Sequence, residues 1–178
     1  WFGNALSFNC EFEKATNHTQ RALDINMAAR NLWGISAIKG ILALFCYYYP
    51  GKINLGSQIS SEAVDVAEES GDIYSKAHAY ISHGIFCYGK GLLEVAEGHL
   101  LKGAEFCEKI NYQVWNFAAR FNLGEVYFEL KDFQRSKEHY EKVSLILDKL
   151  RCFPSWANLV KVGFTRSKVM NREKEVNL

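Results

Sequence analysis

Apolar residues in this chain recur at the three- and four-residue spacing of a helix face, and short polar turns separate the segments that carry the pattern. Residues 112–130 form one such segment and residues 133–150 the next, with Lys131-Asp132 between them. Their apolar stripes are Trp115, Ala119, Leu123, Val126 and Tyr127, and then Phe133, Ser136, Tyr140, Val143 and Leu147. This pattern predicts two amphipathic helices that form an antiparallel hairpin.

The same alternation of helix and turn continues through the rest of the chain. We expect helices at 1–8, 12–30, 32–48, 53–69, 73–88 and 92–109. Pro50 cannot continue a helix, and Gly51 adopts the positive φ that often follows one, so the helix over 32–48 should end there. A last helix is expected from Pro154 to about Asn171, and the charged residues 171–178 are expected to fray.

A glycine followed by a small residue twelve positions later returns at a period of about forty residues. The copies are Phe2-Gly3 with Phe12 and Ala15, Ile53 with Gly56, His83-Gly84 with Leu93 and Ala96, Leu123-Gly124 with Phe133 and Ser136, and Val162-Gly163. Such a period is typical of a stacked solenoid. We predict an all-α superhelix of helix hairpins in one domain, 1–178, with repeats at 1–31 (partial), 32–71, 72–111, 112–152 and 153–178 (partial).

The phased small residues indicate where the two helices of a hairpin cross. Glycine inside a helix costs about 1 kcal/mol relative to alanine, so its return at one phase indicates a packing requirement. We expect Gly84 to face Ala96, and Gly124 to face Ser136, at close helix crossings. The second copy departs from this pattern, because Leu44 stands where glycine is expected.

The repeat resembles the tetratricopeptide repeat (TPR). Leu123-Gly124-x-x-Tyr127 followed by Phe133-x-x-Ser136-x-x-x-Tyr140 is similar to its signature, and the copies around Gly3 and Gly84 are weaker matches. The unit is longer than the usual TPR, like the extended repeats of bacterial signalling ATPases, LuxR-type activators and nucleotide cyclases. HEAT and armadillo repeats share the length but not this phasing. The start at Trp1, inside a repeat, suggests a fragment of a larger multidomain protein.

The resemblance implies that the first helix of each pair lines a concave groove that binds a partner. The residues carried over for this role are Ile41, Phe45, Tyr48, Tyr49, His78, Ile81, Ile85, Tyr88, Phe121, Glu125, Phe128 and Glu129. They are mainly aromatic and aliphatic, and exposed apolar surface of this extent is typical of an interface. The occupant could be a protein or peptide partner, neighbouring domains of the same chain, or a second copy of the chain. Alternatively, these side chains could pack against one another within a tight superhelix. The cations that grip a chaperone tail are missing, which argues against chaperone docking.

Composition excludes several functional classes. A net charge of +1 lacks the cationic excess of a nucleic-acid binder, and the longest apolar stretch, 40–50, is too short to span a bilayer. The cysteines, Cys10, Cys46, Cys87, Cys107 and Cys152, are widely spaced, which favours buried thiols in a reducing cytoplasm over a disulfide framework or a metal site.

No catalytic motif is visible, and no cofactor or metal is expected. The histidines follow no metal-binding spacing, and His83 is interpreted as a packed core residue, with a pH-sensitive role as the alternative. The sequence therefore favours a non-catalytic protein-interaction or regulatory scaffold, the cytoplasmic arm of a bacterial signalling protein. The alternative is a receptor domain whose groove binds a peptide or a small effector.

Overall fold

The computed structural model describes residues 2–150 and 154–176, and all the regular elements in these ranges are helices. Their bounds are α1 Phe2–Phe8, α2 Phe12–Ala28, α3 Leu32–Ile41, η1 Leu42–Tyr48, α4 Ile53–Ser70, α5 Ile73–Gly89, α6 Leu93–Lys109, α7 Gln113–Glu129, α8 Phe133–Leu150 and α9 Pro154–Val176. The prediction of an all-α chain of hairpins is confirmed for this part of the chain.

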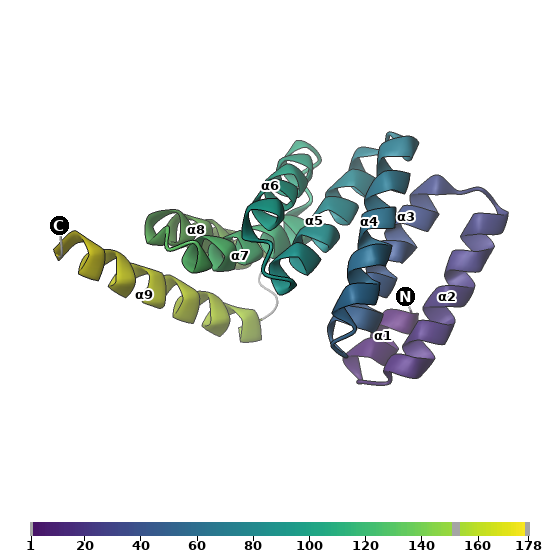
Figure 1. Cartoon of the computed structure of the whole chain (residues 1–178), viewed down its shortest axis with the longest axis horizontal. Coiled ribbons are helices and arrows are strands. Elements are labelled where there is room, and N and C mark those ends of the chain that lie inside the picture. Colours follow the sequence, from purple (N-terminus) through teal and green to yellow (C-terminus); the bar gives the residue numbers. More distant parts are fainter. Residues whose placement is uncertain (1, 151–153, 177–178) are drawn as a thin grey trace.

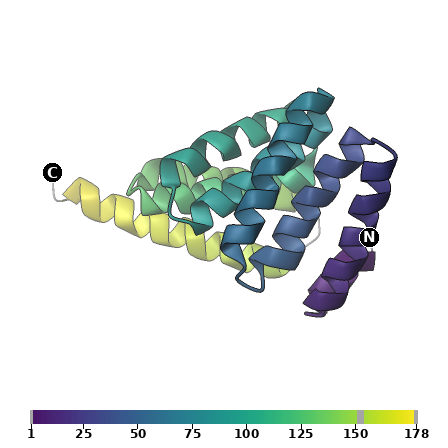
Figure 2. The ribbon, with the colours of Figure 1, turned by 45° about the vertical axis from the view of Figure 1, so that its right-hand side comes forward.

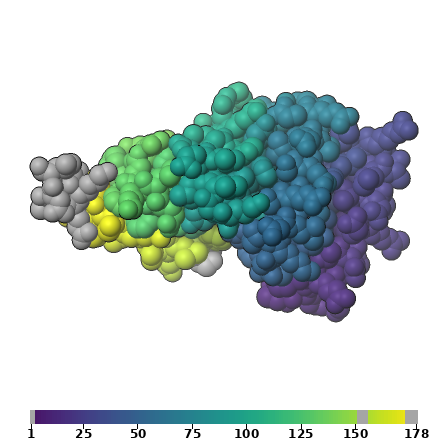
Figure 3. Space-filling model, viewed as in Figure 1, coloured from purple at the N-terminus to yellow at the C-terminus, as the bar shows by residue number. Residues whose placement is uncertain are grey.

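The helices stack in chain order, from α1 at one end to α9 at the other (Figure 1). Each helix packs against the next one, and α3 also contacts α5, α5 contacts α7, and α7 contacts α9. The odd-numbered helices from α3 onward thus form a continuous layer. The turned view shows the same progression (Figure 2), and the space-filling view shows an elongated body ordered along the chain (Figure 3). This is the solenoid that the sequence period predicts.

Backbone conformation repeats with the sequence. The turn inside successive hairpins contains a residue with positive φ, at Cys10 (61°), Gly51 (77°), Gly91 (74°) and Lys131 (60°). The turn between successive hairpins also contains a residue with positive φ, at Arg30 (51°), Gly71 (70°) and Asn111 (55°). Each of these residues follows a helix end, where the left-handed conformation lets backbone N–H groups reach the last carbonyls of the helix.

The second repeat departs from the others in its first helix, which changes from α3 into the π-helix η1 at Leu42. Residues 32–52, the first helix and its turn, form a segment one residue longer than 73–92 or 113–132. A π-helix closes its hydrogen bonds over one more residue than an α-helix, so it can absorb the extra residue within the stack. This repeat is also the one with Leu44 in the glycine position.

Two boundary predictions differ from the structure. Helix α2 ends at Ala28, ahead of the positive φ of Arg30, although the predicted helix extends to residue 30. Helix α9 continues to Val176, beyond the helix end expected at about Asn171. The Arg, Glu and Lys residues there are good helix formers, and the Asn171 amide donates to the Gln134 side chain of α8 (3.5 Å).

Candidate functional site

An open hollow of about 430 Å³ lies on the face shared by η1, α5, α7 and α9. Its lining comes from η1 and the adjoining turn, from α5, from α7 and from the start of α9. The lining residues are Leu44, Phe45, Tyr48, Tyr49, Ile85, Tyr88, Trp115, Phe117, Ala118, Phe121, Asn122, Glu125 and Trp156. We call this hollow the aromatic groove. Its volume lies within the range of known ligand pockets, about 300–1,000 Å³.

Aromatic contacts hold the walls of the aromatic groove. On one side, the ring of Trp156 meets the rings of Phe117 and Phe121 edge-on, with centroids 5.4 and 5.2 Å apart. On the other, Tyr48 packs edge-on against the buried ring of Phe86, at 5.3 Å. Such edge-to-face pairs stabilise one ring orientation, so the walls are preformed. Tyr49, in contrast, leaves 58% of its surface exposed at the rim.

The polar end of the aromatic groove is built around Glu125 on α7. Its carboxylate accepts hydrogen bonds from the hydroxyl of Tyr140 on α8 and from the guanidinium of Arg166 on α9 (2.6 Å). The Arg166 guanidinium also lies over the ring of Phe128, 3.9 Å from its centroid. Three helices therefore converge on a single carboxylate at this end.

The tyrosines of the aromatic groove remain protonated at neutral pH. Burial raises the pKa of Tyr88 to about 12, and the negative charges of Glu125 and Glu129 add to the effect. Burial also raises the pKa of Tyr48 and of Tyr49 above the ordinary value. Their hydroxyl groups therefore remain available as hydrogen-bond donors beside a mainly apolar surface.

The aromatic groove contains many of the residues expected from the family resemblance. Those that line it are Phe45, Tyr48, Tyr49, Ile85, Tyr88, Phe121 and Glu125. They lie on η1, the turn after it, α5 and α7, which are the first helices of their pairs. Their role in binding a partner stays a prediction.

The other expected residues lie elsewhere. Ile81 has no exposed surface and packs in the core, where it fills the space next to Gly103 of α6, so it is not available to a partner. His78 is buried against Trp115, with ring centroids 4.0 Å apart. Ile41 lines a separate depression with Ile38 and residues of α1 and α2. Phe128 packs against Phe133, and Glu129 is exposed outside the groove lining.

Sequence reasoning missed several lining residues. They are Leu44, Trp115, Phe117, Asn122 and Trp156. Leu44 lies in η1 and lines the groove, whereas the usual repeat has glycine at this position. Trp156 is contributed by the first turn of α9, in the next repeat.

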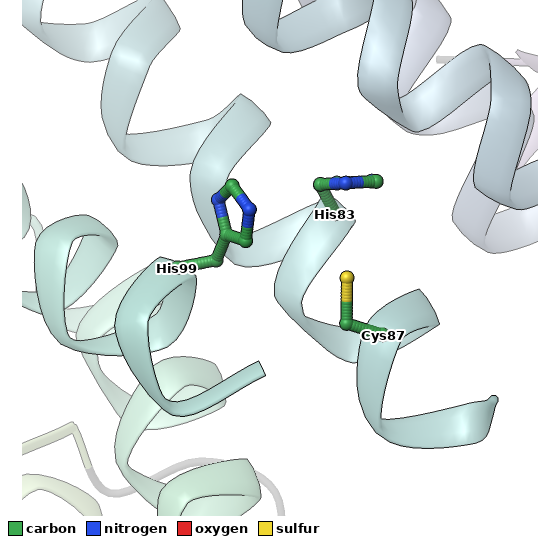
Figure 4. Close-up of side chains that lie close together, drawn as sticks. All are labelled: His83, Cys87 and His99. Carbon is green, nitrogen blue, oxygen red and sulfur yellow. The ribbon is translucent and has the colours of Figure 1, made fainter. Parts of the chain in front are cut away.

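A second cluster of chemically competent side chains lies between α5 and α6. His83 and Cys87 are four residues apart on α5, and His99 faces them from α6 (Figure 4). One ligand-type atom from each of the three lies within 4.8 Å of the others. Burial lowers the pKa of His83 to about 4, with a smaller effect from His99, and burial also lowers the pKa of His99. The sequence reasoning expected no metal site, because it compared spacings along the chain and not across the hairpin.

Solved structures with a similar fold are repeat proteins. BtubC (BKLC) from P. vanneervenii superposes with a TM-score of 0.80 at 17% identity, over 95% of this chain and 70% of that one. Nearly identical TPR-like repeats of a kinesin light chain candidate from Podosopora anserina give TM-scores of 0.73 and 0.72 at 15% identity, over 98% of this chain and 85% of theirs. The chain has a TPR-like fold. At these identities the likeness establishes the fold alone.

Sequence comparison adds no relative. No protein-family model matches the chain, and no curated protein matches it. In the part of the chain that the structure describes, no helix has the length and apolarity needed to span a bilayer. The predicted TPR-like superhelix is thus confirmed for the described residues.

Proposed function

We propose that this chain is a non-catalytic interaction domain that binds an apolar segment of a partner protein in the aromatic groove. The observation that carries the proposal is the preformed hollow of about 430 Å³ whose walls are Phe45, Tyr48, Phe121 and Trp156. Aromatic residues are enriched at interfaces, and an apolar cleft of this size has room for one or two large side chains of a partner.

The polar end of the groove would set the orientation of a bound segment. Because the Glu125 carboxylate is already paired with Arg166, an incoming acidic group would meet a neutralised site. Exposed Glu129 and the protonated hydroxyl of Tyr88 favour a partner that has a basic or hydrogen-bonding residue next to its apolar anchors. We therefore propose a segment with one or two aliphatic or aromatic anchors and a flanking lysine or arginine.

A peptide-display selection tests this proposal directly. Peptides selected on the wild-type chain should share apolar anchors with a basic flank, and their affinity should fall at least tenfold for Tyr49→Ala and Tyr88→Ala. Leu145→Ala on α8 is the matched control, since Leu145 is 63% exposed but outside the groove. Selection of peptides whose binding resists both groove substitutions would contradict the proposal.

The wider setting that we propose is the cytoplasmic arm of a multidomain signalling protein from a bacterium. The extended repeat supports it, because such units resemble those of signalling ATPases, transcriptional activators and cyclases. The described cysteines are free thiols, which suits a reducing compartment. The full-length gene tests this setting, since an ATPase, cyclase or helix-turn-helix region should accompany the repeats.

A second candidate is a receptor for a small effector. The observation that favours it is again the groove volume, which is large enough for a compact organic molecule. A thermal-shift screen with the longest available chain separates the two candidates. Stabilisation by a small molecule that is lost in Tyr88→Ala would favour the receptor, whereas stabilisation by peptides alone would favour the interaction domain.

A further inference from the structure

We propose that His83, Cys87 and His99 bind one divalent transition-metal ion of the zinc class, through two imidazole nitrogens and one thiolate. This site is separate from the aromatic groove, since none of the three residues lines it. The fourth coordination position would be open to water or to an external ligand, as in zinc sites with three protein ligands.

The positions of the three residues follow from helix geometry. Residues i and i+4 are neighbours on a helix surface, so His83 and Cys87 project from adjacent turns of α5. His99 lies on α6, which packs closely on α5 because Gly84 leaves no side chain between them: a Cβ on Gly84 would lie 2.7 Å from Leu100 Cγ. Two rigid helices thus present all the ligands, which favours a preorganised site.

The separation of the ligand atoms is compatible with a bound ion. Atoms that coordinate one tetrahedral zinc lie about 3.5 Å apart, given Zn–N bonds of about 2.0 Å and Zn–S bonds of about 2.3 Å. The three ligand-type atoms now lie within 4.8 Å of one another. Small side-chain rotations would close the difference without moving either helix, since the terminal torsion of histidine is broad.

A hydrogen bond to Ser60 orients the ring of His83 for metal binding. The hydroxyl of Ser60 on α4 donates to the Ser57 carbonyl (2.9 Å), so its oxygen accepts a hydrogen bond from Nδ1–H of His83, also at 2.9 Å. This tautomer leaves the lone pair of His83 Nε2 available to a metal. Metal-binding histidines typically use one nitrogen as ligand and anchor the other in this way.

Accessibility and charge are also suitable for binding. His83 and His99 are partly exposed and Cys87 is buried, so an arriving ion would meet the two imidazoles before the thiol. Binding would release the Cys87 proton to solvent and leave a thiolate–metal bond. The carboxylate of Asp65 acts on His83 and would offset the remaining positive charge, which Lys90 and Lys102 oppose.

Cobalt spectroscopy is the decisive experiment. The untagged full chain, with Cys10 and Cys152 replaced by serine and metal removed by a chelator, should bind one Co²⁺. It should show a near-ultraviolet thiolate-to-cobalt charge-transfer band, which Zn²⁺ then displaces. Cys87→Ala should abolish the band, and His99→Gln should weaken affinity at least tenfold. Ser60→Ala should weaken affinity about 10- to 100-fold, the usual effect of losing an anchor of a ligand.

Control variants distinguish a loss of metal binding from a loss of the fold. Cys107→Ala also removes a buried thiol, from α6, but should keep the cobalt band. Zn²⁺ should raise the melting temperature of the wild type and of Cys107→Ala but not that of His99→Gln, whose partly exposed side chain can change without loss of the fold. Absence of the band in the folded wild type, or its persistence in Cys87→Ala, would overturn the proposal.

Discussion

The ring of Tyr140 on α8 occupies the space next to Gly124 on α7, and a Cβ built on that glycine would lie 2.8 Å from Tyr140 Cζ. Gly163 of α9 meets the same ring. The hydroxyl of Ser136 donates to the Gly124 carbonyl at 2.7 Å, so backbone and side chain are in direct contact at the crossing. The recurring glycines of the sequence therefore mark the points where a neighbouring helix packs against bare backbone.

Gly124→Leu should destabilise the domain by several kcal/mol. The new side chain would need the volume that the buried ring of Tyr140 fills, and overpacking of this kind forces side chains and backbone out of place. Urea unfolding at 25 °C measures the free energy of unfolding of both proteins. An unchanged unfolding midpoint would contradict the close crossing of α7 and α8.

Gly98→Ala is the matched control for this substitution. Gly98 is also a helical glycine, on α6, but a Cβ there would have no neighbour within 4 Å. The substitution should stabilise the chain by about 0.5–1 kcal/mol, because alanine is the better helix former. A loss of stability in Gly98→Ala would mean that a side chain is unfavourable even at a helical glycine with no close neighbour, so the loss at Gly124 could not be assigned to contact with Tyr140.

Much of the fold could be predicted from the sequence because its determinants are local and repeated. The apolar stripes predicted the helices, the glycine period predicted the helix crossings, and turns such as Pro50-Gly51 predicted where the hairpin helices end. Each repeat supplies the same signal again, so an error in one copy is corrected by the others. Gly84 and Gly124 lie at helix crossings in the structure, as expected, but the side chains that they meet are Leu100 and Tyr140, one turn beyond Ala96 and Ser136.

The rest of the fold and of the candidate site depends on contacts between helices, which the period of apolar residues does not reveal. The π-helix η1 of the second repeat, which carries the groove residue Leu44, leaves no mark in the apolar period. The expected groove residue Ile81 is buried, because Gly103 of α6 lets that helix approach it closely. The cluster of His83, Cys87 and His99 forms only when the hairpin closes.

Lys131→Gly should raise the free energy of unfolding by about 1 kcal/mol. Lys131 adopts a φ of 60° in the turn after α7, where Gly51 and Gly91 stand in the preceding repeats. A left-handed conformation costs a residue with a Cβ roughly 1–2 kcal/mol, which glycine avoids. Thermal unfolding should show a higher midpoint for this variant. Lys142→Gly, inside α8, should show the opposite shift, and equal shifts would contradict the argument.

Stability should fall as the pH decreases from 7 toward 5, in part because of His139. Burial lowers the pKa of His139 to about 3, with smaller effects from Arg120, Lys142 and Arg135, while the unfolded chain keeps the ordinary value of 6.5. Between these values the unfolded state binds the extra proton, so this contribution to stability is complete above 6.5 and decreases as the pH falls below it. From pH 7 to 5.5 the expected loss is about 1 kcal/mol for this residue.

His139→Gln isolates that contribution. Urea unfolding at pH 7 and at pH 5.5 should show a stability loss about 1 kcal/mol smaller than in the wild type, and both pH values lie above the range in which the carboxylates titrate. Asn17→Gln, at an exposed position on α2 without a titratable group, serves as the control and should retain the pH dependence of the wild type. An identical pH dependence in His139→Gln would show that His139 is not held neutral by burial.

Glu125→Gln should loosen the last helix from the stack. The Glu125 carboxylate pairs with Arg166 of α9 and accepts from Tyr140, and a neutral amide would weaken both contacts. Hydrogen bonds to charged groups contribute about 1.5–3 kcal/mol, so hydrogen exchange of the α9 amides should accelerate about tenfold or more.

Glu141→Gln, which changes an exposed pair with Lys137, should leave these rates nearly unchanged. A double-mutant cycle with Arg166→Met should give a coupling above about 1 kcal/mol, and a coupling near zero would show that the pair does not hold α9 in place.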